Sequence, residues 1–134
     1  MEESAVWFNS THMKMTVTIN TQHGNVDIAT DVIATVVGAS TTEIFGVVGM
    51  TSKNAVKDNF RNILGQENYS KGVVVTTTDN QTIIGVYVVV SYGVKISEVA
   101  KNIQERIRFN LENQLGIVAA KVNVYVQNVK VVED

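Results

Sequence analysis

The most informative pattern of apolar positions runs from Gly72 to Gly116 and predicts a β-hairpin followed by a helix. Two runs rich in valine and isoleucine flank the polar residues 79–81, which is the pattern of a hairpin. The second run, residues 82–92, is apolar at nearly every position, so we expect a strand that is central in its sheet or covered on both faces. In the helix, apolar residues recur at spacings of three and four and form one stripe that can lie on the hairpin. The stripe consists of Ile96, Val99, Ala100, Ile103, Ile107, Leu111 and Leu115.

A second hairpin is predicted at the start of the folded chain. Apolar and polar residues alternate over residues 15–20, a polar turn covers residues 22–25, and the alternation resumes over residues 26–28. A helix should follow, because Thr30 or Asp31 can accept a hydrogen bond from an otherwise unpaired amide of the first turn. We expect the inner face of this helix to consist of Val32, Ile33, Val36 and Val37.

The middle of the chain contains shorter segments. Residues 44–50 predict a short strand or an extended connection, and Ser52 is expected to begin a second helix over residues 53–64. Gly65 follows at the position that favours a left-handed helix end, and residues 66–71 have the character of a polar loop.

The last strand follows Gly116, which is expected to end the long helix. Its apolar residues alternate with polar ones up to Gln127 and then change parity. A strand cannot do this without an extra residue, so we expect a bulge or turn at Gln127–Asn128. The alternating apolar set is Ala120, Val122, Val124 and Val126.

These elements predict an α+β domain of two layers, a mixed or antiparallel sheet with helices packed mainly on one face. The domain is expected to cover residues 15–134. Residues 1–14 do not share its periodicity and end near a His-Met pair, so we interpret them as a tag-like leader or an upstream extension that is disordered. The alternative is that the aromatic pair Trp7-Phe8 packs against the surface of the domain.

Composition and net charge limit the classes of function that the chain can have. Of 134 residues, 45% are apolar and 18% charged, which is typical of a packed globular protein. The net charge of -2 disfavours a dedicated nucleic-acid binder, which needs excess positive charge. Cysteine is absent, as is typical of cytosolic proteins, and there is neither a signal-peptide pattern nor an apolar run of the roughly 18 residues that a membrane span needs. We therefore expect a cytoplasmic protein without an integral membrane segment.

Metal and catalytic sites are not expected. The two histidines, His12 and His23, stand in the leader and in a turn, without cysteine or any metal-binding spacing. Ser91 precedes Tyr92 and Gly93 but lacks the first glycine of the GxSxG nucleophile motif. The carboxylates on the outer face of the long helix are expected to be solvated. They are Glu98, Glu105 and Glu112.

A basic stripe and a candidate anion site lie near the second helix. Lys53, Lys57 and Arg61 are four residues apart on one side of that helix, with Lys71 expected nearby. The stripe can contact an acidic partner, anionic lipid or nucleic acid, or it can be long side chains that lie along the core. The preceding segment, residues 46–53, does not have the spacing of a phosphate loop, although amides at the helix start could hold an anion.

Phe109 is the clearest candidate contact residue. At about 100° per residue it falls almost opposite the apolar stripe of the long helix. A large aromatic on the outer face of a charged helix indicates a binding surface or self-association, unless a second layer or the leader covers it.

Four motifs, taken in order along residues 15–132, carry a resemblance to a known family. They are Gly24-Asn25-Val26-Asp27-Ile28 with Asp31-Val32-Ile33-Ala34, then Gly46-Val47-Val48-Gly49-Met50, the stretch from Val90 to Ala100, and Val122 to Gln127. With them the chain resembles the alkaline-shock-protein family of Gram-positive bacteria, and its short YloU-like members in particular.

The resemblance implies a non-enzymatic cytoplasmic protein linked to cell-envelope homeostasis and to the alkaline or general stress response. Some relatives are held at the membrane by a separate anchor protein, and no catalytic residue is established for the family. We therefore expect a protein-protein interaction module with a protein partner, membrane-anchored or not, or with a second copy of itself. The alternatives are a regulatory module that binds a small anion or a lipid-related ligand and, more weakly supported, RNA binding.

Overall fold

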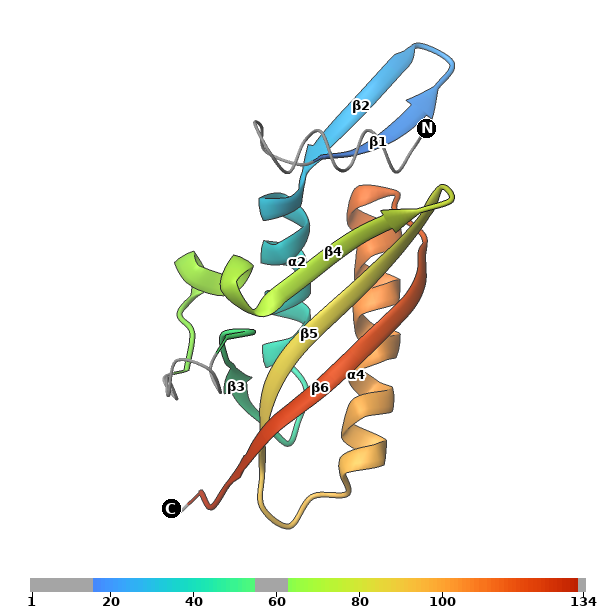
Figure 1. Cartoon of the computed structure of the whole chain (residues 1–134). Helices are drawn as coiled ribbons and strands as arrows, with labels where there is room; N and C mark the ends of the chain where they lie inside the picture. Colours follow the sequence, from blue (N-terminus) through green and yellow to red (C-terminus); the bar gives the residue numbers. More distant parts are fainter. Residues whose placement is uncertain (1–15, 55–62, 133–134) are drawn as a thin grey trace.

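The computed structural model describes residues 16–54 and 63–132 (Figure 1). The predicted leader, residues 1–14, therefore lies outside the described residues. The elements in chain order are β1 (Thr16–Thr21), β2 (Gly24–Ala29), α2 (Thr30–Thr42), β3 (Val47–Met50), the 3-10 helix η1 (Gln66–Gly72), β4 (Val73–Thr78), β5 (Gln81–Ser91), α4 (Ile96–Asn110), the π-helical turn η2 (Leu111–Leu115) and β6 (Ala119–Lys130).

Strand β5 is the centre of a four-stranded mixed sheet. Its first half pairs antiparallel with β4, from Thr78 opposite Gln81 to Val73 opposite Val86. Its last residues pair antiparallel with β3 on the same edge, and its whole opposite edge pairs with β6 in parallel. The prediction of a central strand in a mixed sheet is confirmed.

Helices α2 and α4 lie together behind this sheet and cover one of its faces (Figure 1). Alternate residues of β5 that point into the core, such as Val86 and Val88, are 0% exposed. From α4, Ile103 and Ile107 are equally buried in the same core cluster. The two-layer α+β architecture is therefore confirmed, with the core between one sheet face and two helices.

Both predicted hairpins form. In the β4–β5 turn, Asp79 and Asn80 have φ values of 53° and 64°. Two successive residues with positive φ match the right-handed twist of the strands, and Asp and Asn tolerate this conformation better than most residues. The β1–β2 hairpin forms a sheet of its own beyond the end of the main sheet (Figure 1). It is held through Val17, which is buried, and through Ile19 and Ile28, which pack against the core.

Helix α4 connects β5 to the parallel strand β6. It continues through η2 and ends at Gly116, whose φ of 73° confirms the predicted left-handed helix end. The expected bulge is also confirmed, because Val88 faces Val126 while Val89 faces Asn128. A second shift, between Ala119 and Lys121, was not predicted. It turns Ala119 into the core and leaves Ala120 exposed, contrary to the expected alternation.

Several local predictions are wrong. The N-cap position of α2 is Ala29, with no side-chain cap hydrogen bond, so neither Thr30 nor Asp31 takes that place. Val32 is 45% exposed and Ile96 is 41% exposed. Val32 points outward because α2 packs through its neighbouring side, which consists of Ile33, Ala34, Val37, Gly38, Ser40 and Thr41. Ile96 is the first residue of α4, one turn before the helix makes its first buried contact at Val99.

The segment around the predicted second helix also differs. Lys53 and Asn54 lie in a turn, and residues 63–64 have no regular structure, while residues 55–62 lie outside the described residues. Gly65 has φ -82° and ψ 173°, which is extended backbone and not a left-handed helix end. The predicted polar loop over residues 66–71 is a 3-10 helix instead. Tyr69 lies in this segment and packs against the core, which explains why the segment is ordered.

The small residue Gly38 allows this packing. A Cβ atom at Gly38 would fall within the ring of Tyr69, so α2 and η1 approach as closely as they do only because this side chain is missing. The Tyr69 hydroxyl lies 3.5 Å from the hydroxyl of Thr42, one helical turn further along α2.

We predict that Gly38→Ala lowers the free energy of unfolding by about 1–3 kcal/mol, because the added methyl group displaces the Tyr69 ring. In a Tyr69→Ala background the same change should be neutral or stabilising by about 0.5–1 kcal/mol, since alanine is the better helix former. Urea unfolding of the four proteins measures both effects. An equal cost in the two backgrounds would show that Tyr69 does not constrain this position.

Candidate functional site

The structure places Phe109 on the exposed side of α4, where helical spacing predicts it, with 64% of the residue accessible to solvent. A second aromatic residue, Phe45, belongs to the same side of the molecule and is 90% exposed. Phe45 lies in the connection between α2 and β3. Two phenylalanines exposed to this extent indicate a contact surface, since single-chain proteins usually bury such side chains.

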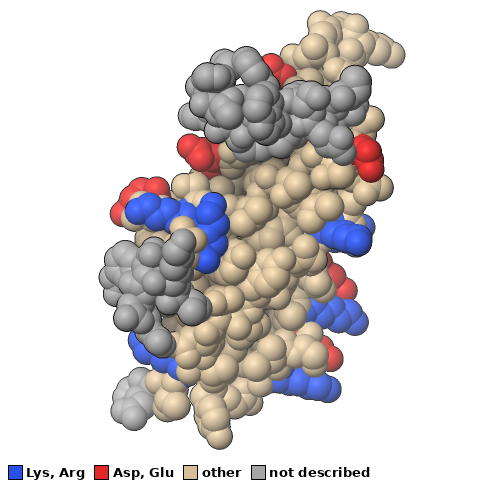
Figure 2. All heavy atoms as spheres, in the orientation of Figure 1, with Lys and Arg blue, Asp and Glu red and all other residues tan. Residues whose placement is uncertain are grey.

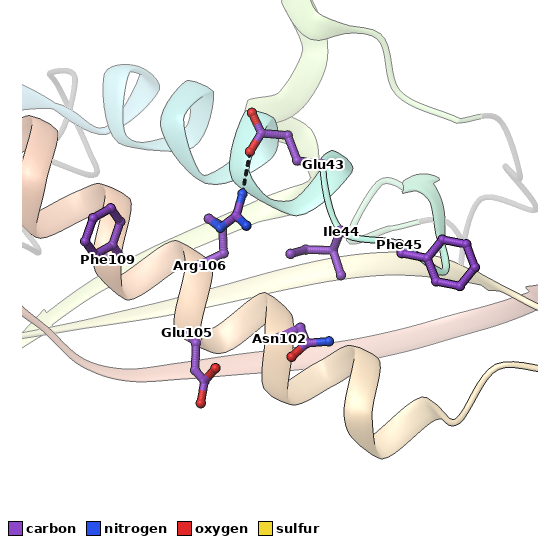
Figure 3. Close-up of a pocket in the computed structure, with 7 residues that line it drawn as sticks. All are labelled: Glu43, Ile44, Phe45, Asn102, Glu105, Arg106 and Phe109. Atoms are coloured by element: carbon purple, nitrogen blue, oxygen red, sulfur yellow. Dashed lines mark hydrogen bonds and ion pairs between the residues drawn. The ribbon is translucent and has the colours of Figure 1, made fainter.

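Both phenylalanines line one hollow in the surface, of about 340 Å³. Figure 3 shows them at its two ends, with the polar side chains between them. The hollow is lined by Glu43, Ile44, Phe45, Asn102, Glu105, Arg106 and Phe109. We call this the Phe45–Phe109 surface.

An ion pair crosses the middle of the Phe45–Phe109 surface. Arg106 Nη1 donates to Glu43 Oε1 at 2.9 Å and links α4 to the end of α2 (Figure 3). The two side chains are 46% and 58% exposed, so the pair contributes at most about 1 kcal/mol to stability. Its clearer effect is to hold both charged groups in place between the aromatic rings.

The helices beneath this surface are held by a buried polar link. Asn110 Nδ2 of α4 donates to Ser40 Oγ of α2 at 2.7 Å, and that hydroxyl donates to the Val36 carbonyl at 2.7 Å. Ser40 is only 1% exposed, so its hydrogen bonds are sheltered from water. This link holds α2 and α4 in a fixed position relative to each other beneath the Phe45–Phe109 surface.

A tight connection after α2 explains why Phe45 points outward. The Ile44 amide donates to the Thr41 carbonyl and the Val47 amide donates to the Ile44 carbonyl, at 3.2 and 3.1 Å. Ile44 is 8% exposed and fills the core, so the next side chain turns toward solvent. Gly46 then takes a φ of 100°, which returns the chain toward β3.

The other predicted side chains form no catalytic arrangement in the described residues. Glu98 and Glu105 of α4 and Glu112 of η2 are exposed, as expected. The residues that the structure describes contain no group of three acidic or histidine side chains able to hold a metal. Ser91 bonds through its amide to the Gly46 carbonyl at 2.8 Å. His23 belongs to the turn of the β1–β2 hairpin, where its amide donates to Thr21 Oγ1.

Of the basic stripe, the structure brings together Lys53 and Lys71, whose backbones share a hydrogen bond of 2.9 Å. Lys57 and Arg61 lie outside the described residues. The amides expected to hold an anion are already bonded. The Thr51 amide donates to the Tyr87 carbonyl, the Lys53 amide to the Lys71 carbonyl, and the Asn54 amide to Ser52 Oγ. This part of the segment therefore offers an anion none of these three donors.

The model of the alkaline shock protein 23 family, described as having a "cell envelope-related function", matches residues 18–131. The chain belongs to the alkaline-shock-protein family. It is 67% identical over 118 residues to the uncharacterized protein Spy1614 of Streptococcus pyogenes serotype M6, which covers 88% of this chain and 98% of the relative. It is 43% identical over 117 residues to the uncharacterized protein YloU of Bacillus subtilis, covering 87% and 98% of the two chains.

A third relative within the alkaline-shock-protein family is more distant. The uncharacterized protein YqhY of Bacillus subtilis is 34% identical over 113 residues, which cover 83% of this chain and 81% of the relative. No solved structure matches the chain significantly. Within the described parts of this alkaline-shock-protein chain, no helix has the length and apolar character needed to cross a membrane.

Sequence reasoning found Phe109 but missed Phe45 in this alkaline-shock-protein domain. The missed signal is the run from Glu43 to Gly46, in which a large aromatic sits between a polar helix end and a glycine. The sequence pattern places Phe45 in a short strand or extended connection over residues 44–50, whereas β3 begins only at Val47. Residues 44–47 form a tight turn instead, and this turn directs the Phe45 side chain into solvent.

We predict that Phe45→Asp and Phe109→Asp each change the free energy of unfolding by no more than about 1 kcal/mol, as expected for exposed positions. The contrasting variant is Ile107→Ala, two residues from Phe109 and 0% exposed, which should cost about 2–5 kcal/mol. Chemical unfolding of the three variants provides the comparison. A loss of several kcal/mol in Phe109→Asp would mean that this ring is buried in the folded chain.

Proposed function

We propose that this alkaline-shock-protein domain is a non-enzymatic protein-interaction module that serves cell-envelope homeostasis and the stress response. In this proposal the Phe45–Phe109 surface contacts a protein partner in the cytoplasm, and a membrane-anchored partner brings the domain to the membrane. The observation that carries the proposal is the pair of exposed phenylalanines at the two ends of one hollow.

The physical character of the surface supports a protein partner. Aromatic residues and arginine are enriched among the residues that dominate binding energy at protein interfaces. Here Phe45, Phe109 and Arg106 occur together, and acidic side chains surround them. Burying the two rings against a partner removes apolar surface from water, which favours binding. The Glu43–Arg106 pair offers both a donor and an acceptor to polar groups of the partner.

A ligand-binding module remains the rival function. Its support is the contact of Lys53 with Lys71 at the edge of η1. A thermal-shift screen against phosphates and acyl ligands addresses it, and a shift lost in Lys71→Glu would favour the rival. RNA binding, the weaker rival, would show an affinity that falls steeply with salt concentration.

We predict that immobilised wild-type domain captures a specific protein from a membrane fraction of Streptococcus pyogenes, the source of the 67% identical relative, and that Phe45→Asp and Phe109→Asp lose it. Each substitution places an unpaired charge where an apolar contact is needed, and such changes at a central contact weaken binding by about tenfold or more.

The matched control is Val118→Asp. Val118 is 65% exposed, nearly the same as Phe109, but it does not line the hollow. The control should retain the captured protein. If all three variants keep it, or if Val118→Asp loses it equally, the Phe45–Phe109 surface is not the site of binding. Quantitative mass spectrometry of the captured fractions gives the amount of captured protein for each variant relative to the wild type.

A further inference from the structure

Strand β6 forms an outer edge of the main sheet, and part of this edge has unsatisfied backbone groups. β6 pairs with β5 on one side and with no other strand among the described residues. Unpaired strand edges bind other strands readily, so proteins normally block them. The sheet face beside this edge shows no charged side chains over the middle of β4, β5 and β6 (Figure 2).

The hydrogen bonds of β5 determine which groups of β6 point outward. The Tyr87 carbonyl and the Ser91 amide both bond toward the β3 side of β5, so by alternation Val88 bonds toward β6. In a parallel pair, Tyr125 and Gln127 of β6 then bond to β5 on either side of Val88, and Val124 and Val126 point their backbone groups outward.

Side chains close this outer edge at both ends. Gln104 Nε2 of α4 donates to the Val122 carbonyl at 2.9 Å. Asn128 Oδ1 accepts from the Val129 amide at 2.8 Å. Between these two positions, the outward N–H and C=O groups of Val124 and Val126 face no other strand in the part of the chain that the structure describes. The stretch from Val122 to Val129 also contains no charged residue.

We propose that a second copy of this chain pairs with β6 through these groups, in an antiparallel arrangement about a two-fold axis at Tyr125. In that register Val124 faces Val126 of the second copy and Val126 faces its Val124. All four outward groups of each chain are then used. Moving the axis to residue 124 would require the Val122 carbonyl that Gln104 occupies, and moving it to residue 126 would require Asn128, which bonds toward β5 after the bulge.

The register also places Tyr125 of one chain opposite Tyr125 of the second copy. This would be a non-hydrogen-bonded pair, in which the Cα atoms lie only about 4.5 Å apart and side chains contact most closely. Tyr125 is 41% exposed and already stacks on Tyr87, with ring centroids 4.7 Å apart. The two-fold would thus extend the pair into a row of four tyrosines on the sheet face. Aromatic cross-strand pairs of this kind stabilise antiparallel sheets.

The geometry has two consequences for the assembly. Because the axis is perpendicular to the sheet, both copies have their helices on the same side, and both Phe45–Phe109 surfaces belong to one side of the dimer. Lys121 of one copy comes near Lys130 of the other at the ends of the paired stretch, so added salt should strengthen the association by screening them. An association driven by opposite charges would weaken instead.

We predict that the wild-type chain sediments with twice its monomer mass of 14.7 kDa at the higher end of the micromolar range and dissociates on dilution. The chain has no cysteine, so a single introduced thiol reports on the contact. Tyr125→Cys should form a disulfide-linked dimer under mild oxidation, because the paired Cα atoms would lie within the range a disulfide spans. Val118→Cys, at an exposed position away from the axis, should form little disulfide-linked dimer under the same conditions.

Variants of opposite charge at Tyr125 distinguish loss of the dimer contact from an effect on folding. Tyr125→Lys and Tyr125→Glu should each be monomeric, because two like charges would lie directly opposite, and an equimolar mixture of the two should recover the dimer mass. A wild-type chain that stays monomeric at every concentration would overturn the proposal. So would a dimer in which Tyr125→Cys cross-links no faster than Val118→Cys, or a mixture of the charged variants that stays monomeric.

Discussion

Strand β5 forms hydrogen bonds along both of its edges, and the positions of the other elements follow from this pairing. One edge is divided between β4 and β3, and the other is occupied by β6 over nearly its full length. A parallel partner cannot follow through a tight turn, so the chain must cross over between β5 and β6, and α4 is that crossover. Its position beneath β5 then determines where α2 packs, through Ser40 and Asn110. The two surfaces proposed for binding are regions that this arrangement leaves uncovered.

Two uncovered regions result, and they differ in chemistry. On the helix side, Phe45 and Phe109 offer apolar area with an ion pair between them, which suits a folded partner. On the sheet side, the outer edge of β6 offers backbone groups, which suit another strand. A dimer formed through β6 would present the helix-side surface twice, and a partner held at a membrane would then be bound with higher avidity than by one copy. The two proposals are independent, since neither surface contains residues of the other.

The sequence predicts those features that follow from local pattern. The hairpins, the amphipathic α4, its end at Gly116 and the bulge after Val126 each depend on a few neighbouring residues, and all were anticipated. The errors occur where distant contacts decide. Gly65 was assigned a helix end, but η1 is ordered by Tyr69 against Gly38, which no local spacing reveals. Phe109 was predictable from helical periodicity, whereas Phe45 required knowing that Ile44 fills the core.

In the function proposed above, the Phe45–Phe109 surface contacts another protein in the cell. The most direct measurement is photo-cross-linking in living cells, with a benzophenone side chain in place of Phe109 and, in a parallel strain, in place of the equally exposed Val118. We expect an adduct of defined mass from position 109 that is absent from position 118. No adduct at position 109, or the same adduct from both positions, would contradict it.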